Sequence, residues 1–93
     1  MAQYRSPTKV VEEILTFAEC TGQQGIRSTA LQTKANLSYL RLSKLLKKLT
    51  DAGLIATKEI DKKNAFVITF KGREYLESYR RFMGIAESYG LEL

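Results

Sequence analysis

The 93-residue chain has no histidine, no tryptophan and a single cysteine, Cys20. Without histidine it cannot form a His-based general base or the usual His-containing metal site. One cysteine excludes an internal disulfide, and with no histidine to activate it Cys20 is expected to be a packed or incidental thiol. Paired carboxylates, a Gly-rich phosphate loop and a nucleophile with its base are also missing. The sequence therefore predicts a protein that is not an enzyme and that uses no cofactor or metal.

The chain is short and has no long apolar run. A domain of 93 residues buries roughly 60–65% of the surface that its unfolded form exposes, which is enough for one hydrophobic core. No apolar run approaches the roughly 18 residues that span a bilayer. Met1–Arg5 are expected to open directly onto a helix and not to form a signal peptide. The sequence thus predicts one soluble, cytoplasmic domain. Because its core is small, partner subunits are expected to matter to its stability.

Positive charge is concentrated in the middle of the chain. Residues 1–26 carry a net charge of −1 and residues 74–93 carry −2, whereas residues 27–73 carry +8. The basic residues of that middle segment are Arg27, Lys34, Arg41, Lys44, Lys47, Lys48, Lys58, Lys62, Lys63, Lys71 and Arg73. They favour a polyanionic partner, with nucleic acid ahead of a membrane because no basic helix with a broad apolar face accompanies them. The alternative is a charged face that only keeps the protein in solution.

Capping residues predict two helices in the first third of the chain. Ser6 followed by Pro7 is a helix start, because the hydroxyl accepts a free N–H and proline lacks one. This first helix is expected to run to about Cys20. Residues 23–26 are expected to form a loop, after which Ser28 can cap a helix of at most two turns that ends at Lys34.

A tight turn leads into a third helix. Asn36 tolerates the left-handed conformation that ends a helix, and Ser38 can cap the next one, Tyr39–Ala52, which Gly53 terminates. One face of this helix is apolar, with Leu42, Leu45, Leu46 and Leu49. The opposite face is cationic, with Lys44, Lys47 and Asp51 outermost, Arg41 and Lys48 on one flank and Ser43 on the other. This arrangement matches a helix-turn-helix whose second helix can enter the major groove.

Leu40 is an apolar residue on the solvent side of the third helix. In this position it would be able to contact a thymine methyl or a partner subunit. It is otherwise one of the scattered leucines that every protein surface carries, and this is the interpretation that the sequence favours.

The next segment predicts a β-hairpin. Residues 54–60 and 65–70 are typical of two strands, and Asp61–Asn64 form a polar tip with two lysines. In this tip Asp61 begins a type I turn and Asn64 is expected to adopt a positive φ. One face, with Phe66, Ile68 and Phe70, is expected to be buried. The hairpin would form a basic wing beside the cationic helix.

The last helix, which Thr69 can cap, carries an unusually aromatic stripe. The stripe comprises Tyr75, Leu76, Tyr79, Phe82, Met83 and Ala86. Its first residues are expected to close the core, and its far half needs another partner. We therefore expect a homodimer built on Tyr79, Phe82, Met83 and Ala86. The alternative is intramolecular packing of this half against the first helix.

The order of three helices, a hairpin and a last helix is the winged-helix arrangement, and particular residues resemble a known family. They are the segment Ala35–Tyr39, the positions Leu46, Leu49, Gly53, Leu54 and Ile55, and the segment Ile68–Gly72 followed by Leu76. Over about residues 8–80 they resemble archaeal winged helix-turn-helix DNA-binding proteins, namely the ArnR-like predicted transcription regulators and the small ten-kilodalton DNA-binding proteins. The resemblance implies duplex DNA as ligand and a homodimer. The last helix departs from the family pattern, because it is shorter than a long coiled coil, richer in aromatics and without a strict heptad.

The sequence thus predicts an α+β, mostly helical winged helix-turn-helix, with a DNA-binding core over residues 1–70 and a C-terminal helix over residues 71–93. The expected function is binding of double-stranded DNA as a nucleoid-associated transcription regulator. Base edges are expected to meet Ser38, Tyr39, Arg41, Ser43 and Lys44, and phosphates are expected to meet Lys47, Lys48, Arg27 and Lys34, with Lys58, Lys62, Lys63 and Asn64 from the wing.

Three other functions stay open at this point. Winged helices also serve as protein-docking modules, which would use the aromatic helix or the wing. A general chromatin-associated protein would bind DNA without strong sequence preference. RNA binding by the same basic face would need exposed aromatics to stack on unpaired bases, and only Tyr39 is suitably placed for that.

Overall fold

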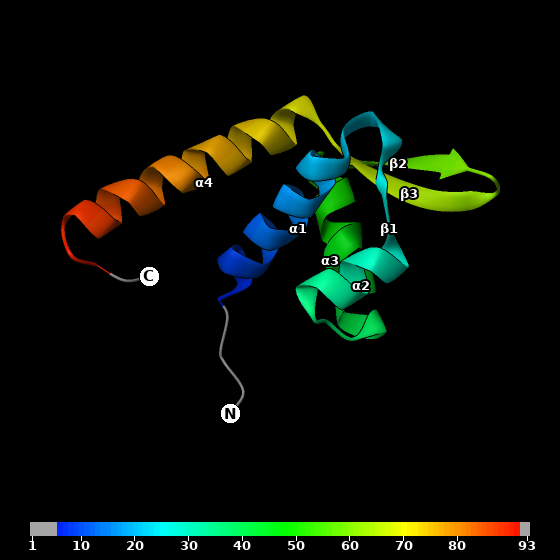
Figure 1. Cartoon of the computed structure of the whole chain (residues 1–93), viewed down its shortest axis with the longest axis horizontal. Helices are drawn as coiled ribbons and strands as arrows, with labels where there is room; N and C mark the ends of the chain where they lie inside the picture. The colour runs from blue at the N-terminus through cyan, green and yellow to red at the C-terminus, as the bar shows by residue number, and fades with distance from the viewer. Residues whose placement is uncertain (1–5, 92–93) are drawn as a thin grey trace.

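The computed structural model describes residues 6–91, and its elements follow the predicted order with two additions, the short elements η1 and β1. They are α1 (Pro7–Thr21), the 3-10 turn η1 (Gly22–Gln24), β1 (Ile26–Arg27), α2 (Ser28–Ala35), α3 (Tyr39–Asp51), β2 (Ile55–Ile60), β3 (Lys63–Ile68) and α4 (Phe70–Ser88). Figure 1 shows α1, α2 and α3 grouped together, with the hairpin of β2 and β3 extending from one side and α4 from the other. The expectation that Met1–Arg5 lead directly into a helix concerns residues outside the described range.

Side-chain caps start three of the four helices as predicted. The hydroxyl of Ser6 accepts a hydrogen bond from the Lys9 N–H at 3.2 Å, and that of Ser38 accepts one from the Arg41 N–H at 3.3 Å. The hydroxyl of Thr69 likewise accepts one from the Gly72 N–H at 3.0 Å. Each bond satisfies a backbone donor that the helix itself leaves free.

The predicted cap of α2 is wrong. Ser28 is already the first helical residue, and the N-cap position belongs to Arg27, whose side chain makes no capping bond. Arg27 is extended because it ends β1, which pairs Ile26 with Phe66 and Arg27 with Ala65. The segment over residues 23–26, expected to be a loop, therefore contributes a strand residue to an antiparallel sheet with the order β1-β3-β2.

The sheet buries its two faces differently from the prediction. Ile68 is buried and Phe66 half-buried, but Phe70 is 75% exposed. The predicted burial of Phe70 is wrong because β3 ends at Ile68 and Phe70 is the first residue of α4. On the other face Ala65 is buried, because the backbone of Gly25 packs so closely that a Cβ there would lie 3.0 Å from the Ala65 Cβ.

The core lies where α1, α2, α3 and the start of α4 meet the sheet. Its largest fully buried side chains are Ile14, Leu15, Leu31, Leu42 and Leu76. The predicted apolar face of α3 is confirmed, since Leu42, Leu46 and Leu49 are buried and Leu45 packs half-buried against them. Within residues 6–91, no helix has the length and apolar character needed to cross a membrane.

The first turns of α4 dock on the turn that follows α3. The Thr69 hydroxyl donates to the Gly53 carbonyl at 2.6 Å, and the Thr69 N–H donates to the Leu54 carbonyl at 3.2 Å. Gly72 packs directly against the Leu54 carbonyl oxygen. This close approach is possible because Gly72 has no side chain.

Beyond this docking point α4 touches α1 and then extends away from the rest of the fold (Figure 1). Arg80 donates to Glu19 and to the hydroxyl of Thr16, both at 3.2 Å. Tyr79 directly precedes Arg80, and Tyr75 lies one turn before Tyr79. Burial raises the pKa of Tyr75, with a smaller contribution from Tyr79. These contacts anchor the middle of α4 and leave its last turns beyond them.

We expect Gly72→Ala to destabilise the fold by about 1–3 kcal/mol, because the new methyl would collide with the Leu54 carbonyl oxygen and lie 2.8 Å from Ile68 Cγ1. Gly84→Ala in the same helix is the matched control. A Cβ at Gly84 meets nothing within 4 Å, so alanine should stabilise the helix by about 1 kcal/mol. Urea unfolding followed by circular dichroism at one protein concentration measures both, and equal shifts of the two variants would contradict the close docking of α4.

Candidate nucleic-acid interface

The turn between α2 and α3 sets the direction of α3. Asn36 adopts the predicted left-handed conformation, with φ 53° and ψ 53°. The Leu37 N–H donates to the Gln32 carbonyl at 3.1 Å, and the Leu37 side chain is buried in the core. With Ser38 capping α3, every residue of this turn has a structural task. The helix-turn-helix predicted from the sequence is confirmed.

The solvent-facing side of α3 divides into a ridge and two flanks. At 100° per residue, Leu40, Lys44 and Lys47 lie on the ridge opposite the buried Leu42. Ser43 lies on the flank that faces the hairpin. Arg41 and Lys48 lie on the other flank, and both are exposed. The cations predicted on α3 are therefore at the surface, but they do not all face the same way.

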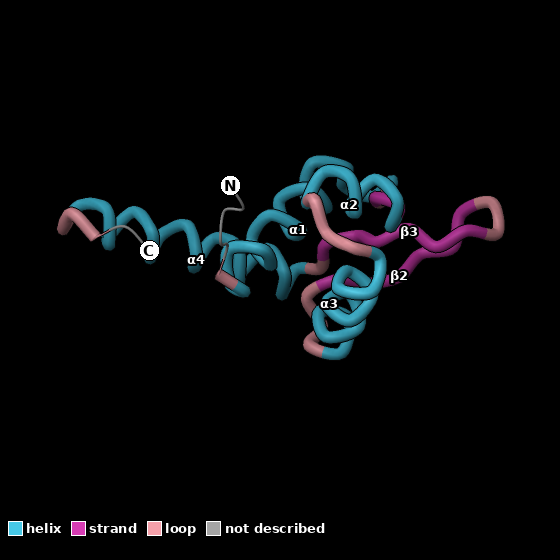
Figure 2. Tube along the Cα trace, turned by 90° about the horizontal axis from the view of Figure 1, so that it is seen from below, coloured by secondary structure: helices cyan, strands magenta, loops and turns pink. Residues whose placement is uncertain are grey.

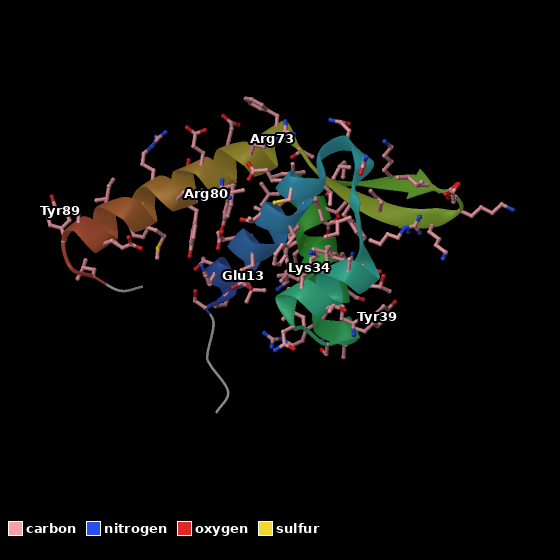
Figure 3. The ribbon with its side chains drawn as sticks, in the orientation of Figure 1. Glu13, Lys34, Tyr39, Arg73, Arg80 and Tyr89 are labelled. Atoms are coloured by element: carbon pink, nitrogen blue, oxygen red, sulfur yellow. The ribbon has the colours of Figure 1, made fainter. Side chains whose placement is uncertain are left out.

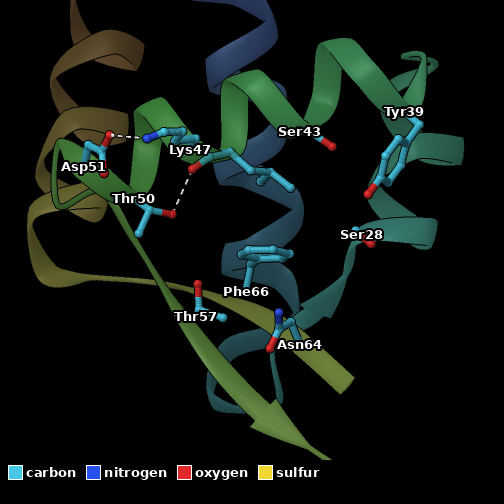
Figure 4. A pocket seen from close by; sticks show the side chains of 10 residues that line it. Ser28, Tyr39, Ser43, Lys47, Thr50, Asp51, Thr57, Asn64 and Phe66 are labelled. Atoms are coloured by element: carbon cyan, nitrogen blue, oxygen red, sulfur yellow. Dashed lines mark hydrogen bonds and ion pairs between the residues drawn. The ribbon is translucent and has the colours of Figure 1, made fainter. Parts of the chain in front are cut away.

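A groove of about 370 Å³ separates α3 from the hairpin. Its lining residues are Ser28, Tyr39, Ser43, Leu46, Lys47, Thr50, Asp51, Thr57, Asn64 and Phe66. Figure 4 shows Tyr39 and Ser43 on the α3 side and Thr57 and Asn64 on the hairpin side, with Phe66 between them. The groove thus brings together Tyr39, Ser43, Lys47 and Asn64 of the predicted site.

The groove contains one ion pair. Lys47 Nζ lies 3.8 Å from Asp51 Oδ2 one turn later, and both side chains are largely exposed. An exposed pair of this kind contributes less than about 1 kcal/mol. Lys47 is therefore able to leave Asp51 for a stronger anion at little cost.

The hairpin turn is tighter than the sequence predicted. Asp61 and Lys62 both have positive φ, 52° and 63°, and connect β2 to β3 as a two-residue turn. Lys63 and Asn64 belong to β3 and pair with Ile60 and Glu59. The prediction of a four-residue tip with positive φ at Asn64 is wrong, because the strands pair right up to the turn.

The basic residues of the wing differ in their freedom. Lys62 and Lys63 are exposed at the tip. Lys58 instead donates from Nζ to the Gln23 carbonyl at 2.9 Å, which ties β2 to η1. Figure 3 shows that the wing projects away from the helices and that the side chains near its tip reach into solvent. The tip is thus the part of the wing that is free to meet a partner.

Three predicted residues lie at the margin of this surface or outside it. Lys34 Nζ lies 5.7 Å from the centre of the Phe17 ring, on the side of α2 that meets α1. Arg27 is half-buried in β1, and the Ser38 hydroxyl is engaged in the cap of α3. The structure does not bring Lys34 to the groove.

Thr57, Phe66 and Ser28 line the groove but were not predicted as site residues. Thr57 pairs with Phe66 in the sheet, and Asn64 lies two residues before Phe66, so all three share the face toward α3. The alternation of side chains between the two faces of a strand could have indicated this shared face. No sequence pattern indicated Ser28, because its position depends on how the start of α2 folds back toward Tyr39.

This fold is similar to those of known winged-helix proteins. A family model described as winged helix-turn-helix matches residues 4–87. Sso10a-2, a DNA-binding protein from Sulfolobus solfataricus, is 21% identical in a crystal structure that superposes with a TM-score of 0.74, covering 91% of this chain and 85% of that one. This match confirms the resemblance to small archaeal DNA-binding proteins. No curated protein matches the chain.

A second group of similar structures is MepR, a transcription regulator of the Staphylococcus aureus multidrug efflux pump MepA. It is 16% identical with a TM-score of 0.77, and the match covers 86% of this chain and 60% of MepR. The structure of a MepR-DNA complex is 17% identical with a TM-score of 0.71, covering 85% of this chain and 58% of that one. At these identities the likeness shows the fold, and this chain spans less than two thirds of MepR. The predicted α+β winged helix is confirmed.

We expect Lys62→Gly to stabilise the protein by about 1 kcal/mol, because glycine adopts the positive φ of this turn without the steric cost that lysine bears. Lys63→Gly is the matched control, since it removes the same charge from a neighbouring position. Lys63 is paired in β3, and glycine within a strand should cost roughly 0.5–1 kcal/mol. Thermal or urea unfolding distinguishes the two, and a loss of stability in Lys62→Gly would contradict the two-residue turn.

Proposed function

The chain belongs to the winged helix-turn-helix family, and we propose that it binds double-stranded DNA and acts as a transcription regulator. In this proposal α3 enters the major groove and the wing lies on the backbone. One observation carries it: the cations of the middle segment are exposed on α3 and at the wing tip, on the two elements that border the groove. The proteins Sso10a-2 and MepR, described respectively as DNA-binding and as a transcription regulator, support the proposal.

The position of each side chain suggests its role. Lys44 lies on the ridge of α3 and Ser43 on the flank that faces the wing, where base edges would be reached. Tyr39 is exposed at the start of the same helix. Arg41 and Lys48 occupy the flank away from the wing. We assign Arg41 to a phosphate, in place of the base edge predicted from the sequence.

The remaining cations serve the backbone. Lys62 and Lys63 at the tip, and Lys47 once released from Asp51, are assigned to phosphates. Lys58 supports the wing through its bond to the Gln23 carbonyl. Arg27, Lys34 and Asn64 are kept as predicted contacts, of which Lys34 lies farthest from the groove.

We expect the affinity for a random duplex of a few helical turns to fall steeply with salt, with a slope of log K against log salt of about −5 or steeper, as for six or more phosphate contacts. Lys62→Ala should weaken binding to all sequences alike and reduce this slope by about 1. The control is Lys9→Ala, because Lys9 lies on α1 and pairs with Glu12 at 3.0 Å.

Fluorescence anisotropy of a labelled duplex at several salt concentrations measures these slopes. No binding even at low salt would overturn the proposal and favour a protein-docking module. Stronger binding to single-stranded RNA than to duplex DNA would favour the RNA-binding alternative. Binding of equal strength to all duplexes would favour a general chromatin-associated protein.

We further propose that the protein is a homodimer formed through the far half of α4. Phe82 is 57% exposed, Ile85 52% and Tyr89 78%, and their spacing of three and four residues places them on one stripe. Tyr79 and Met83 are half-buried beside it. Ala86, expected in this interface, is only 4% exposed within its own chain, so Ile85 takes its place in the proposal.

We expect the wild-type protein to sediment as a dimer at micromolar concentration and Phe82→Asp to sediment as a monomer, because a charge on the stripe would be desolvated in the interface. Phe70→Asp is the matched control: it changes an exposed phenylalanine at the start of α4 and should leave the dimer intact. Analytical ultracentrifugation gives both masses. A monomeric wild-type protein, or monomers for both variants, would refute the interface.

A further inference from the structure

We propose that Leu40 is a specificity-determining residue that contacts the 5-methyl group of thymine in the major groove. This inference rests on the proposed binding of duplex DNA and adds the chemistry of one base contact. The sequence alone favoured an incidental surface leucine. The structure adds three observations that change this balance.

The first observation is the position of Leu40 along α3. It is the second residue of the helix, directly after Tyr39, in the first turn. The N-terminal residues of a recognition helix are those that reach base edges. Ser38, two residues before Leu40, caps the helix and keeps its first turn regular. Leu40 is thus held rigidly at the N-terminal end of α3, the end that would enter the major groove of DNA.

The second observation is its orientation. Leu40 is 63% exposed and points about 160° away from Leu42, which is fully buried. On the same ridge Lys44 follows one turn later and Lys47 two turns later. The attraction of these cations to DNA would bring the ridge, and Leu40 with it, into the major groove of DNA.

The third observation is the absence of an apolar partner along that ridge. The residues that share it with Leu40 are Lys44, Lys47 and Asp51, all charged. The other exposed apolar stripe lies on the far half of α4. Figure 3 places Tyr39, next to Leu40, and Tyr89, at the end of α4, at opposite sides of the molecule. Leu40 is therefore not part of the proposed dimer interface.

The chemistry of the major groove then selects the ligand group. Its base edges present hydrogen-bond donors and acceptors, which a leucine cannot use, and the apolar group of thymine, the C5 methyl. Contact with that methyl removes apolar surface of both partners from water. A leucine at this position therefore discriminates thymine from a base without the methyl.

The test replaces thymine by uracil, which removes the methyl and keeps the Watson–Crick edge. Wild-type protein is first used to enrich binding sites from a random duplex pool. The enriched duplex is then prepared with deoxyuridine at each thymidine position in turn. We expect binding to weaken about three- to fourfold at one position of each half-site, the effect of burying one methyl group.

Leu40→Ala should bind the thymine duplex about as weakly as the wild-type protein binds the uracil duplex, and it should no longer distinguish the two. Alanine suits an exposed helical position, so the variant is expected to fold, which circular dichroism verifies. Phe70→Ala is the matched control, because it removes another well exposed apolar side chain, outside α3, and should retain the discrimination.

Each outcome decides the inference. Wild-type protein that binds both duplexes equally, or Leu40→Ala that still discriminates as strongly, would overturn the role of Leu40 while leaving DNA binding intact. If no site is enriched, random duplexes made with thymidine or with deoxyuridine throughout are compared, with the same expectation. Absence of binding to every duplex would instead overturn the proposed function, and this inference with it.

Discussion

The contact between the start of α4 and the turn after α3 is the constraint on which the arrangement of this protein depends. Thr69 is bonded to the Gly53 and Leu54 carbonyls, and Gly72 packs on the Leu54 carbonyl oxygen. This turn ends α3, begins β2 and receives α4. The directions of the helix proposed to read DNA, of the wing and of the helix proposed to dimerise are therefore fixed at one place. A side chain at position 72 would push these elements apart together.

Charge and packing are separated in this fold. Among residues 6–91 no charged or polar residue is buried, so no charged group within that range has to be stabilised inside the core. In each described ion pair the basic partner is exposed to solvent, so the pair contributes little to folding. The positive charge of the middle segment thus does little to hold the domain together. These clustered cations repel one another in the free protein. A bound polyanion would replace this repulsion with attraction, so the charge contributes to binding and not to folding.

What the sequence predicted well depends on local interactions. The caps at Ser6, Ser38 and Thr69 and the left-handed Asn36 each involve residues within four positions of one another, so their residue types identified them. The apolar stripe of α3 followed from its period.

What the sequence did not predict depends on contacts between distant segments. β1 is two residues long, too short for any periodicity, and exists because β3 pairs with it. The tip of the wing was misjudged because strand pairing, not the preference of Asn64, sets the turn. The groove could not be predicted for the same reason, since its walls are α3 and the hairpin, which only the tertiary fold brings side by side (Figure 2). The roles of its residues stay predictions, because they depend on a ligand.

The length of α4 links the two proposals made for this protein. Leu76 is fully buried and completes the core, whereas the stripe from Phe82 onward extends past it. The molecule is 47 Å long, with the wing at one end and the last turns of α4 at the other (Figure 1). A dimer formed at that far end separates the two copies of α3, and the crossing angle of the paired α4 helices sets their distance. Since successive major grooves on one side of DNA lie about 34 Å apart, this angle determines whether both copies of α3 can read the same duplex.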